Sequence, residues 1–194
     1  LVGDGTRVLG MIAIADRVRE TSLEAVQALR ENGIKTIMLT GDNKVTARVI
    51  AGEIGIETYQ AELMPEDKVR AIQKLQKKHR VVAMVGDGIN DAPALAAASV
   101  GIAMGRAGTD TALETADIAL MGDDPMKIPY LVGLSRQALR IIKQNIAFSL
   151  SVKLAAVALI FPGLLNLWLA ILADTGASLL VILNGMRLLR FRVR

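Results

Sequence analysis

Residues 81–95 read VVAMVGDGINDAPAL, an apolar run that leads directly into a loop with two carboxylates, one carboxamide and two glycines. The run Val81–Val85 predicts a buried strand, and Asp87, Asn90 and Asp91 follow its end. Open α/β sheets bind ligands at the carboxyl ends of their parallel strands. Two aspartates four residues apart also offer the oxygen ligands that Mg²⁺ takes. The stretch therefore predicts a parallel sheet with a magnesium site at its edge.

The sequence on either side of this stretch alternates between apolar strand-like runs and helical segments. We expect strands at 8–15, 35–39, 81–85, 100–103 and 118–121, and helices at 21–31, 44–54, 65–78 and 92–98. Gly3-Asp4-Gly5 predicts a hairpin turn, and Thr21 or Ser22 is the expected cap of the first helix. Repeated strand–helix units predict an α/β fold with a doubly wound, mostly parallel sheet over residues 1–122.

Charge is distributed unevenly along the 194 residues. Residues 1–140 hold 17 Lys and Arg against 18 Asp and Glu, a net charge of −1, whereas residues 141–194 hold 6 against 1, a net charge of +5. A basic end of this kind is typical of a tail that faces a membrane or a nucleic acid. Aromatic residues make up only 3% of the chain, which argues against stacking on nucleic acid. The chain has no cysteine, so it contains no disulfide and no thiolate metal site.

Residues 123–194 predict a second region made of helices. A connecting helix is expected over 123–143, followed by two apolar spans within 144–185 that Pro162-Gly163 separates, and a basic tail over 186–194. Each span approaches the ~20 residues that a bilayer requires, although a buried hairpin in a soluble core is the alternative. Basic residues flank both ends of the hairpin, at Arg136, Arg140, Lys143, Arg187, Arg190, Arg192 and Arg194. The positive-inside rule then predicts that both ends and residues 1–140 are cytoplasmic, in a multi-pass protein of the cell membrane.

Three polar residues stand directly after expected strands, at Asp16, Thr40 and Asp87. Because the carboxyl ends of parallel strands share one edge of a sheet, these groups are expected to converge. The turn Thr40-Gly41-Asp42 adds a hydroxyl and backbone N–H groups beside a helix start, which attracts phosphate. Lys68, in the first turn of its helix, reaches toward a phosphoryl oxygen as a point charge. Taken singly, the turn also fits a plain helix N-cap and Lys68 a solvated lysine.

The loop after the strand 81–85 completes this predicted site. Asp87 and Asp91 are expected to hold Mg²⁺ or its water ligands, and Asn90 to bond a phosphoryl oxygen. Such a site positions a loose phosphoryl transition state by electrostatics.

Two charged residues interrupt the apolar spans. Lys153 lies nine residues before Pro162, and Asp174 lies eleven residues after Gly163. At 1.5 Å per residue both lie ~14–17 Å from the turn, near the middle of a ~30 Å hydrocarbon core. Equal depth and opposite charge favour pairing or a shared polar pathway, since charges inside membranes mark transport routes. A salt bridge that only fixes helix packing is the alternative.

Five motifs of the sequence stand in the order and spacing of a known family. They are residues 16–19 (DRVR), 38–42 (MLTGD), 64–68 (MPEDK), 85–95 and 116–118 (ADI). With them the whole chain resembles the C-terminal part of a P-type cation-transporting ATPase. The resemblance implies a haloacid-dehalogenase-like phosphorylation domain, ATP and Mg²⁺ as cofactors, and upstream parts of the same polypeptide. It also implies a nucleophilic aspartate in an Asp-Lys-Thr-Gly-Thr motif, which this sequence does not contain.

The resemblance also implies roles for single residues. Thr40 and Gly41, in the loop with Asp42, contact the aspartyl-phosphate, and Lys68 neutralises it. Asp87 binds Mg²⁺, and Asn90 and Asp91 complete the site. Asp16 and Arg19 are similar to the family's hinge pair near the nucleotide.

The hairpin resembles one subclass of this family. Residues 172–177 (LADTGA), with Lys153 one helix earlier, are similar to the exporters of zinc, cadmium and lead. There Asp174 takes part in the metal site and Lys153 is its counter-ion. Three alternatives stay open: a copper exporter, a membrane-tethered phosphatase of the same superfamily, and a non-enzymatic module that binds anionic lipid. The expected partners are the bilayer, ATP and a divalent metal ion, and not nucleic acid.

Overall fold

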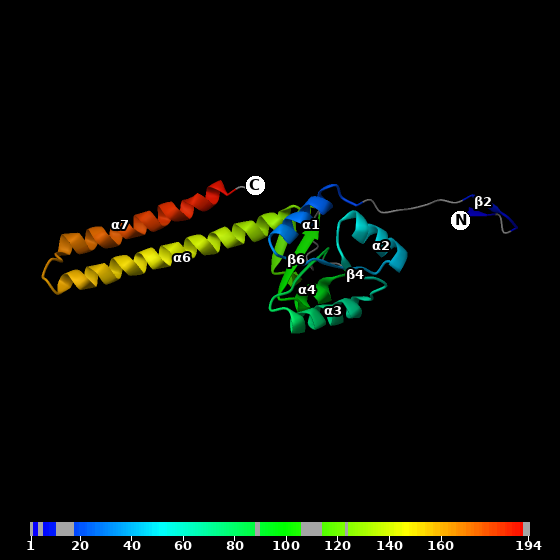
Figure 1. Ribbon diagram of the computed structural model, residues 1–194, viewed down its shortest axis with the longest axis horizontal. Helices are drawn as coiled ribbons and strands as arrows, with labels where there is room; N and C mark the ends of the chain where they lie inside the picture. Colours follow the sequence, from blue (N-terminus) through cyan, green and yellow to red (C-terminus); the bar gives the residue numbers. More distant parts are fainter. Residues whose placement is uncertain are drawn as a thin grey trace. The chain divides into compact units, whose positions relative to one another are not determined.

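The computed structural model describes residues 2–3, 6–10, 18–87, 90–105, 114–122 and 124–191. The chain divides into two compact units, Leu1–Met126 and Lys127–Arg194. The first is an α/β unit and the second is a pair of long helices (Figure 1).

The described strands of the first unit form three small sheets. β1 (Val2–Gly3) pairs antiparallel with β2 (Val8–Gly10), β3 (Ile37–Leu39) pairs parallel with β4 (Thr58–Gln60), and β5 (Ala83–Gly86), β6 (Val100–Gly105) and β7 (Ile118–Met121) are parallel in that order. The helices are α1 (Thr21–Glu31), α2 (Lys44–Glu53), α3 (Pro65–Lys78) and α4 (Ala92–Ala97). The α/β alternation with parallel pairing confirms the predicted fold class.

The structure contains one strand, β4, that the sequence did not predict. The three residues of β4, TYQ, do not form an apolar run, so no sequence pattern indicates a strand there. The strand is evident only from its parallel pairing with β3. Part of the strand expected at 8–15 lies outside the described residues, as do Asp4, Gly5 and Asp16.

A small apolar core joins α3, α4, β5 and β6. It consists of Ile72, Met84, Ala94, Leu95 and Ala103, all between 1% and 7% exposed, with Leu39 of β3 packed against it. Thr40 directly follows β3 and Asp87 directly follows β5. Both residues therefore come after strands that pack against this core.

Local signals set the ends of the helices. Asn43 caps α2, because its side-chain Oδ1 accepts from the backbone N–H groups of Val45 and Thr46. Gly33, with φ of +74°, closes α1 in a conformation that glycine adopts without strain. The expected cap of α1 by Thr21 or Ser22 is wrong: Glu20 precedes the helix without a side-chain cap, and the Thr21 hydroxyl donates to Asp124 Oδ1 at 3.0 Å.

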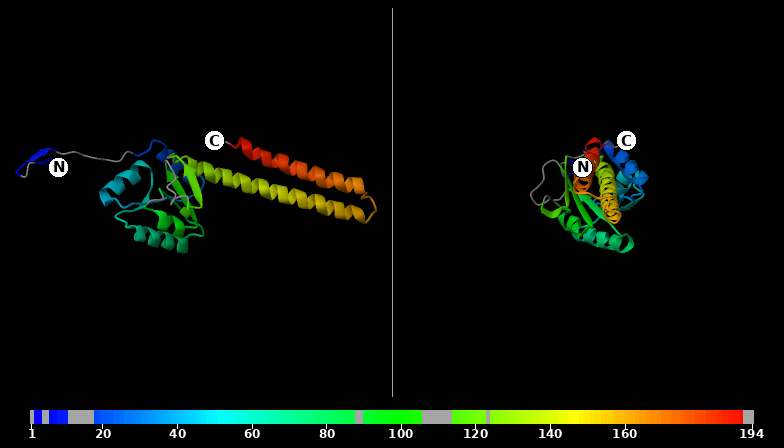
Figure 2. Two further views of the ribbon diagram at one scale, coloured as in Figure 1. Left: turned by 180° about the vertical axis from the view of Figure 1, so that it is seen from behind. Right: turned by 90° about the vertical axis from the view of Figure 1, so that its left-hand side faces the viewer.

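The second unit is a hairpin of two helices that lie side by side (Figure 2). α6 (Lys127–Ile160) runs without a break through the segment expected to connect the units and the first apolar span. α7 (Leu167–Met186) continues into the short 3₁₀ helix η1 (Arg187–Arg190). Both long helices meet the length and hydropathy of a membrane span, and at most 6% of either apolar window is buried. Exposure of this extent argues against the alternative of a soluble core hairpin.

Candidate functional site

An ion pair joins α3 to the loop before α4. Lys68 Nζ lies 2.6 Å from Asp91 Oδ1, and the two side chains are 14% and 15% exposed. The contact forms because Ile72 and Leu95, one turn further along α3 and α4, pack in the same core. A pair so far out of water needs both members, because either alone would be a nearly buried charge. The prediction placed both residues in one site, and the structure brings them into contact.

Gly86, the last residue of β5, lies against the side chain of Asp91 with no room for a side chain of its own. A Cβ atom on Gly86 would lie 2.7 Å from Asp91 Oδ2 and 2.8 Å from Asp91 Cβ. Asp91 and its loop can hold Lys68 only because residue 86 has no side chain.

We expect Gly86→Ala to move Asp91. In the phosphorylation site that the resemblance implies, this change should reduce phosphorylation of the intact polypeptide on the order of 10-fold to 100-fold, because misplacing a group by about 1 Å can cost that much. Rates of phosphoenzyme formation measure this. The control is Gly52→Ala on α2, where an added Cβ meets nothing within 4 Å and stability should rise by about 0.5–1 kcal/mol. Equal rates for Gly86→Ala and the unmodified protein would contradict the positioning of Asp91 by this contact.

The loop after β3 is held by its own side chains. Thr40 Oγ1 donates to Asp42 Oδ2 at 2.8 Å and accepts from the Asp42 backbone N–H at 3.1 Å. The Thr40 and Asp42 carbonyls accept from Leu63 and Glu62, so the loop is also tied to the segment after β4. Because Asn43 already accepts from the N–H groups of Val45 and Thr46, and the Thr40 hydroxyl already donates to Asp42, the backbone around Gly41 is the part of this turn left to face a phosphate.

The remaining predicted residues of this unit lie at exposed positions. Asp87 follows β5 and Asn90 precedes Asp91, and both are exposed. Arg19 is exposed before α1, whereas Asp16 lies outside the described residues. Among the residues that the structure describes, no three His, Cys, Asp or Glu side chains form a metal-binding group. Mg²⁺ needs only one or two protein carboxylates when phosphate and water supply the other ligands, so Asp87 fits this metal.

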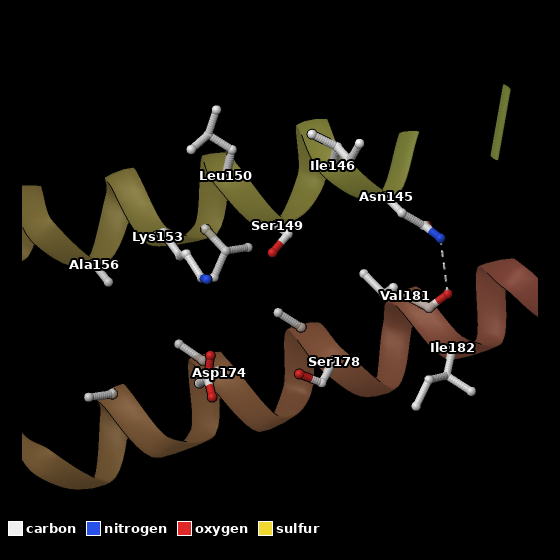
Figure 3. Close-up of a pocket in the computed structure, with 14 residues that line it drawn as sticks. Asn145, Ile146, Ser149, Leu150, Lys153, Ala156, Asp174, Ser178, Val181 and Ile182 are labelled. Atoms are coloured by element: carbon white, nitrogen blue, oxygen red, sulfur yellow. Dashed lines mark hydrogen bonds between the residues drawn. The ribbon is translucent and has the colours of Figure 1, made fainter. Parts of the chain in front are cut away.

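The second candidate site is a groove between α6 and α7 with a cavity volume of about 690 Å³. Its lining is aliphatic except for Asn145, Ser149 and Lys153 of α6 and Asp174 and Ser178 of α7. Lys153 and Asp174 extend toward the groove from opposite helices (Figure 3). Within the described hairpin no ion pair of 4.0 Å or less joins them. The two charges therefore share one groove, as a polar pathway requires, without direct pairing.

Sequence reasoning overlooked a polar cluster at one end of this groove. Asn184 of α7 donates to Asn145 Oδ1 of α6 at 2.8 Å, and Arg187 donates to Asn184 Oδ1 at 2.8 Å. The sequence does contain a signal for this cluster: each apolar span carries an asparagine, Asn145 or Asn184, near the end that lies away from the Pro162-Gly163 turn.

Residues 2–99 match the family model of the haloacid dehalogenase-like hydrolases. The chain belongs to this family. It is 58% identical over 193 residues to a probable cadmium-transporting ATPase of Alkalihalophilus pseudofirmus, and the match covers 99% of the chain. A manganese-exporting P-type ATPase of Mycobacterium bovis is 47% identical over the full chain. Both matches cover 27% of the relative, so the chain spans about a quarter of the length of these proteins.

A solved structure of similar fold includes the helical hairpin. The crystal structure of a zinc-transporting PIB-type ATPase in the E2.Pi state superposes with a TM-score of 0.82 at 46% identity, over 90% of this chain and 28% of that one. The predicted resemblance to heavy-metal P-type ATPases is confirmed by these matches.

Proposed function

We propose that this chain is part of a P-type ATPase that exports a divalent heavy-metal ion through an aspartyl-phosphate intermediate. One observation carries the proposal: the haloacid-dehalogenase-like unit with the Lys68–Asp91 pair continues into an apolar hairpin whose groove holds Lys153 and Asp174. A phosphatase needs only the first part. The matched relatives contain both parts in one chain.

In the α/β unit we assign phosphate contacts to Thr40 and Gly41, and charge neutralisation to Lys68. Lys68 Nζ is held 2.6 Å from Asp91, so its ammonium is fixed before a phosphoryl group arrives. Asp87, with Asn90 and Asp91 beside it, is the assigned Mg²⁺ ligand, and that cation supplies further neutralisation of the phosphoryl oxygens. Asp16 and Arg19 are assigned to the nucleotide, since ATP is the proposed phosphoryl donor.

The phosphorylated aspartate is proposed to come from a part of the polypeptide outside this chain. Among the described strands, β3 pairs only with β4, and β5 pairs on one side only, with β6. β3 and β5 share the core through Leu39 and Met84. A further parallel strand that pairs with these edges would deliver its carboxyl end beside Thr40 and Asp87.

In the hairpin we assign Asp174 to the transported metal and Lys153 to its counter-ion, with the bilayer around both helices. A carboxylate is a ligand that suits Zn²⁺ or Cd²⁺ better than Cu⁺, which prefers sulfur. The relatives named for cadmium and zinc support the same cargo, and the relative named for manganese makes Mn²⁺ the competing one. Basic residues at both helix ends favour a cytoplasmic location for these ends and for the α/β unit.

ATP hydrolysis by the intact polypeptide, measured with Zn²⁺, Cd²⁺, Mn²⁺ and Cu⁺ in turn, tests this function. We expect stimulation by Zn²⁺ or Cd²⁺. Stimulation by Mn²⁺ alone, or by Cu⁺ alone, would show that this ion is the cargo in place of Zn²⁺ or Cd²⁺. Hydrolysis of small phosphate esters without any metal-stimulated ATPase activity would favour the membrane-tethered phosphatase instead.

A further inference from the structure

A directed chain of hydrogen bonds ties α7 to α6 at the end of the hairpin opposite the Pro162-Gly163 turn. Arg187 donates to Asn184 Oδ1 at 2.8 Å, Asn184 Nδ2 donates to Asn145 Oδ1 at 2.8 Å, and Asn145 Nδ2 donates to the Val181 carbonyl at 3.4 Å. Asn184 Nδ2 also lies 3.4 Å from Gln144 Oε1. Gln144, Asn145, Asn184 and Arg187 are called the amide clasp below.

The donor direction within the amide clasp follows from its chemistry. A guanidinium has no acceptor, so Arg187 can bind only the oxygen of the Asn184 amide. This leaves the Asn184 NH₂ group facing α6, where Asn145 Oδ1 accepts it. Asn145 and Asn184 are both half-buried, and their bond crosses between the helices.

Little else along the groove fixes how far one helix slides along the other. Its lining between the clasp and the turn is mostly aliphatic or small, including Ala156, Ala170, Ala173 and Ala177. Van der Waals packing of such residues holds two helices together in lipid, but an interhelical hydrogen bond has one geometry and therefore defines the register more sharply.

The two groove charges lie at nearly the same distance from the clasp. Lys153 follows Asn145 by eight residues and Asp174 precedes Asn184 by ten, which is about 12 Å and 15 Å along the helix axes. Ser149 and Ser178 lie between the two charges and the clasp along their helices (Figure 3). A slip of one helical turn would shift Lys153 by about 5.4 Å relative to Asp174.

We propose that Asn184 and Asn145 are positioning residues for the metal site: their bond sets the register that places Lys153 opposite Asp174. This inference rests on the proposed function, because the metal affinity of the groove is its readout. The clasp acts through Lys153 and Asp174, and its residues are not part of the proposed phosphate site of the α/β unit.

The test is a double-mutant cycle in the intact polypeptide in lipid, with Asn145→Leu, Asn184→Leu and both together. We expect either single change to raise the Zn²⁺ or Cd²⁺ concentration for half-maximal ATPase stimulation about threefold or more, the equivalent of one interhelical hydrogen bond. The double variant should be no worse than a single one, because the two residues act as a unit. Phosphorylation by inorganic phosphate without metal should be unchanged, which a general folding defect would not allow.

Two further variants sharpen the result. Asn145→Asp keeps an acceptor for Asn184 Nδ2 and should restore near-normal metal dependence. Gln137→Leu removes an amide that accepts from Arg140 of the same helix at 3.0 Å, and this change should have no effect. An unchanged metal dependence in Asn184→Leu, or additive effects of the two leucine changes, would overturn the proposal. If the proposed function itself is wrong, the unmodified protein will show no metal stimulation. That outcome differs from every outcome that would overturn the role of the clasp alone.

Discussion

Lys68→Ala should lower phosphoenzyme formation by the intact polypeptide about 10²–10³-fold, the range for loss of one preorganised charge-stabilising group. Lys68 Nζ is fixed by Asp91 and shielded from water, so its charge acts on a phosphoryl group without reorganisation. The rate of acid-stable phosphate incorporation from ATP measures the loss. Lys68→Arg should not restore the rate, because the planar guanidinium does not replace a compact ammonium in a site 14% exposed.

The same change should also destabilise the α/β unit. Asp91 would be left nearly buried without a cation, at a cost of about 1–3 kcal/mol. Lys68→Ala combined with Asp91→Ala should recover much of this stability without recovering phosphorylation, which separates the two effects. Lys74→Ala, on an exposed position of the same helix, is the matched control. Phosphorylation of Lys68→Ala at the normal rate would remove Lys68 from the proposed site.

Asp174→Ala should abolish metal-stimulated ATP hydrolysis, with a loss of affinity on the order of 10²-fold or more for the transported ion. Among the described residues that line the groove, Asp174 is the only carboxylate, and Lys153 alone repels a divalent cation. ATPase activity against Zn²⁺ or Cd²⁺ concentration, with bound metal counted per polypeptide, measures the change.

Two controls frame this prediction. Phosphorylation of Asp174→Ala by inorganic phosphate should persist, because the α/β chemistry is intact. Thr175→Ala, the neighbouring residue that does not line the groove, should keep its metal response. Unchanged metal stoichiometry and stimulation in Asp174→Ala would place the cargo site elsewhere.

The features that the sequence predicted depend on local pattern. Val81–Val85 is apolar and is followed at once by polar residues, so β5 and its loop were predicted, as was a helix from residue 65, where α3 begins. The family motifs added the roles of residues that lie far apart in the chain.

The features that were missed depend on partners distant in sequence. β4 is recognised by its pairing with β3, and Thr21 bonds Asp124, 103 residues away, instead of capping its helix. The direct contact of Lys68 with Asp91 spans 23 residues, and that of Asn145 with Asn184 spans 39. No local pattern encodes such contacts, because they arise when separate elements pack.

ATP-driven uptake of Zn²⁺ or Cd²⁺ into inside-out membrane vesicles that contain the intact polypeptide tests most directly whether the two units work together. We expect uptake by the unmodified protein, and none by Asp87→Ala, whose metal groove is intact, or by Asp174→Ala, whose phosphate site is intact. Uptake that persists in Asp87→Ala, or ATP hydrolysis without any metal uptake by the unmodified protein, would contradict the account.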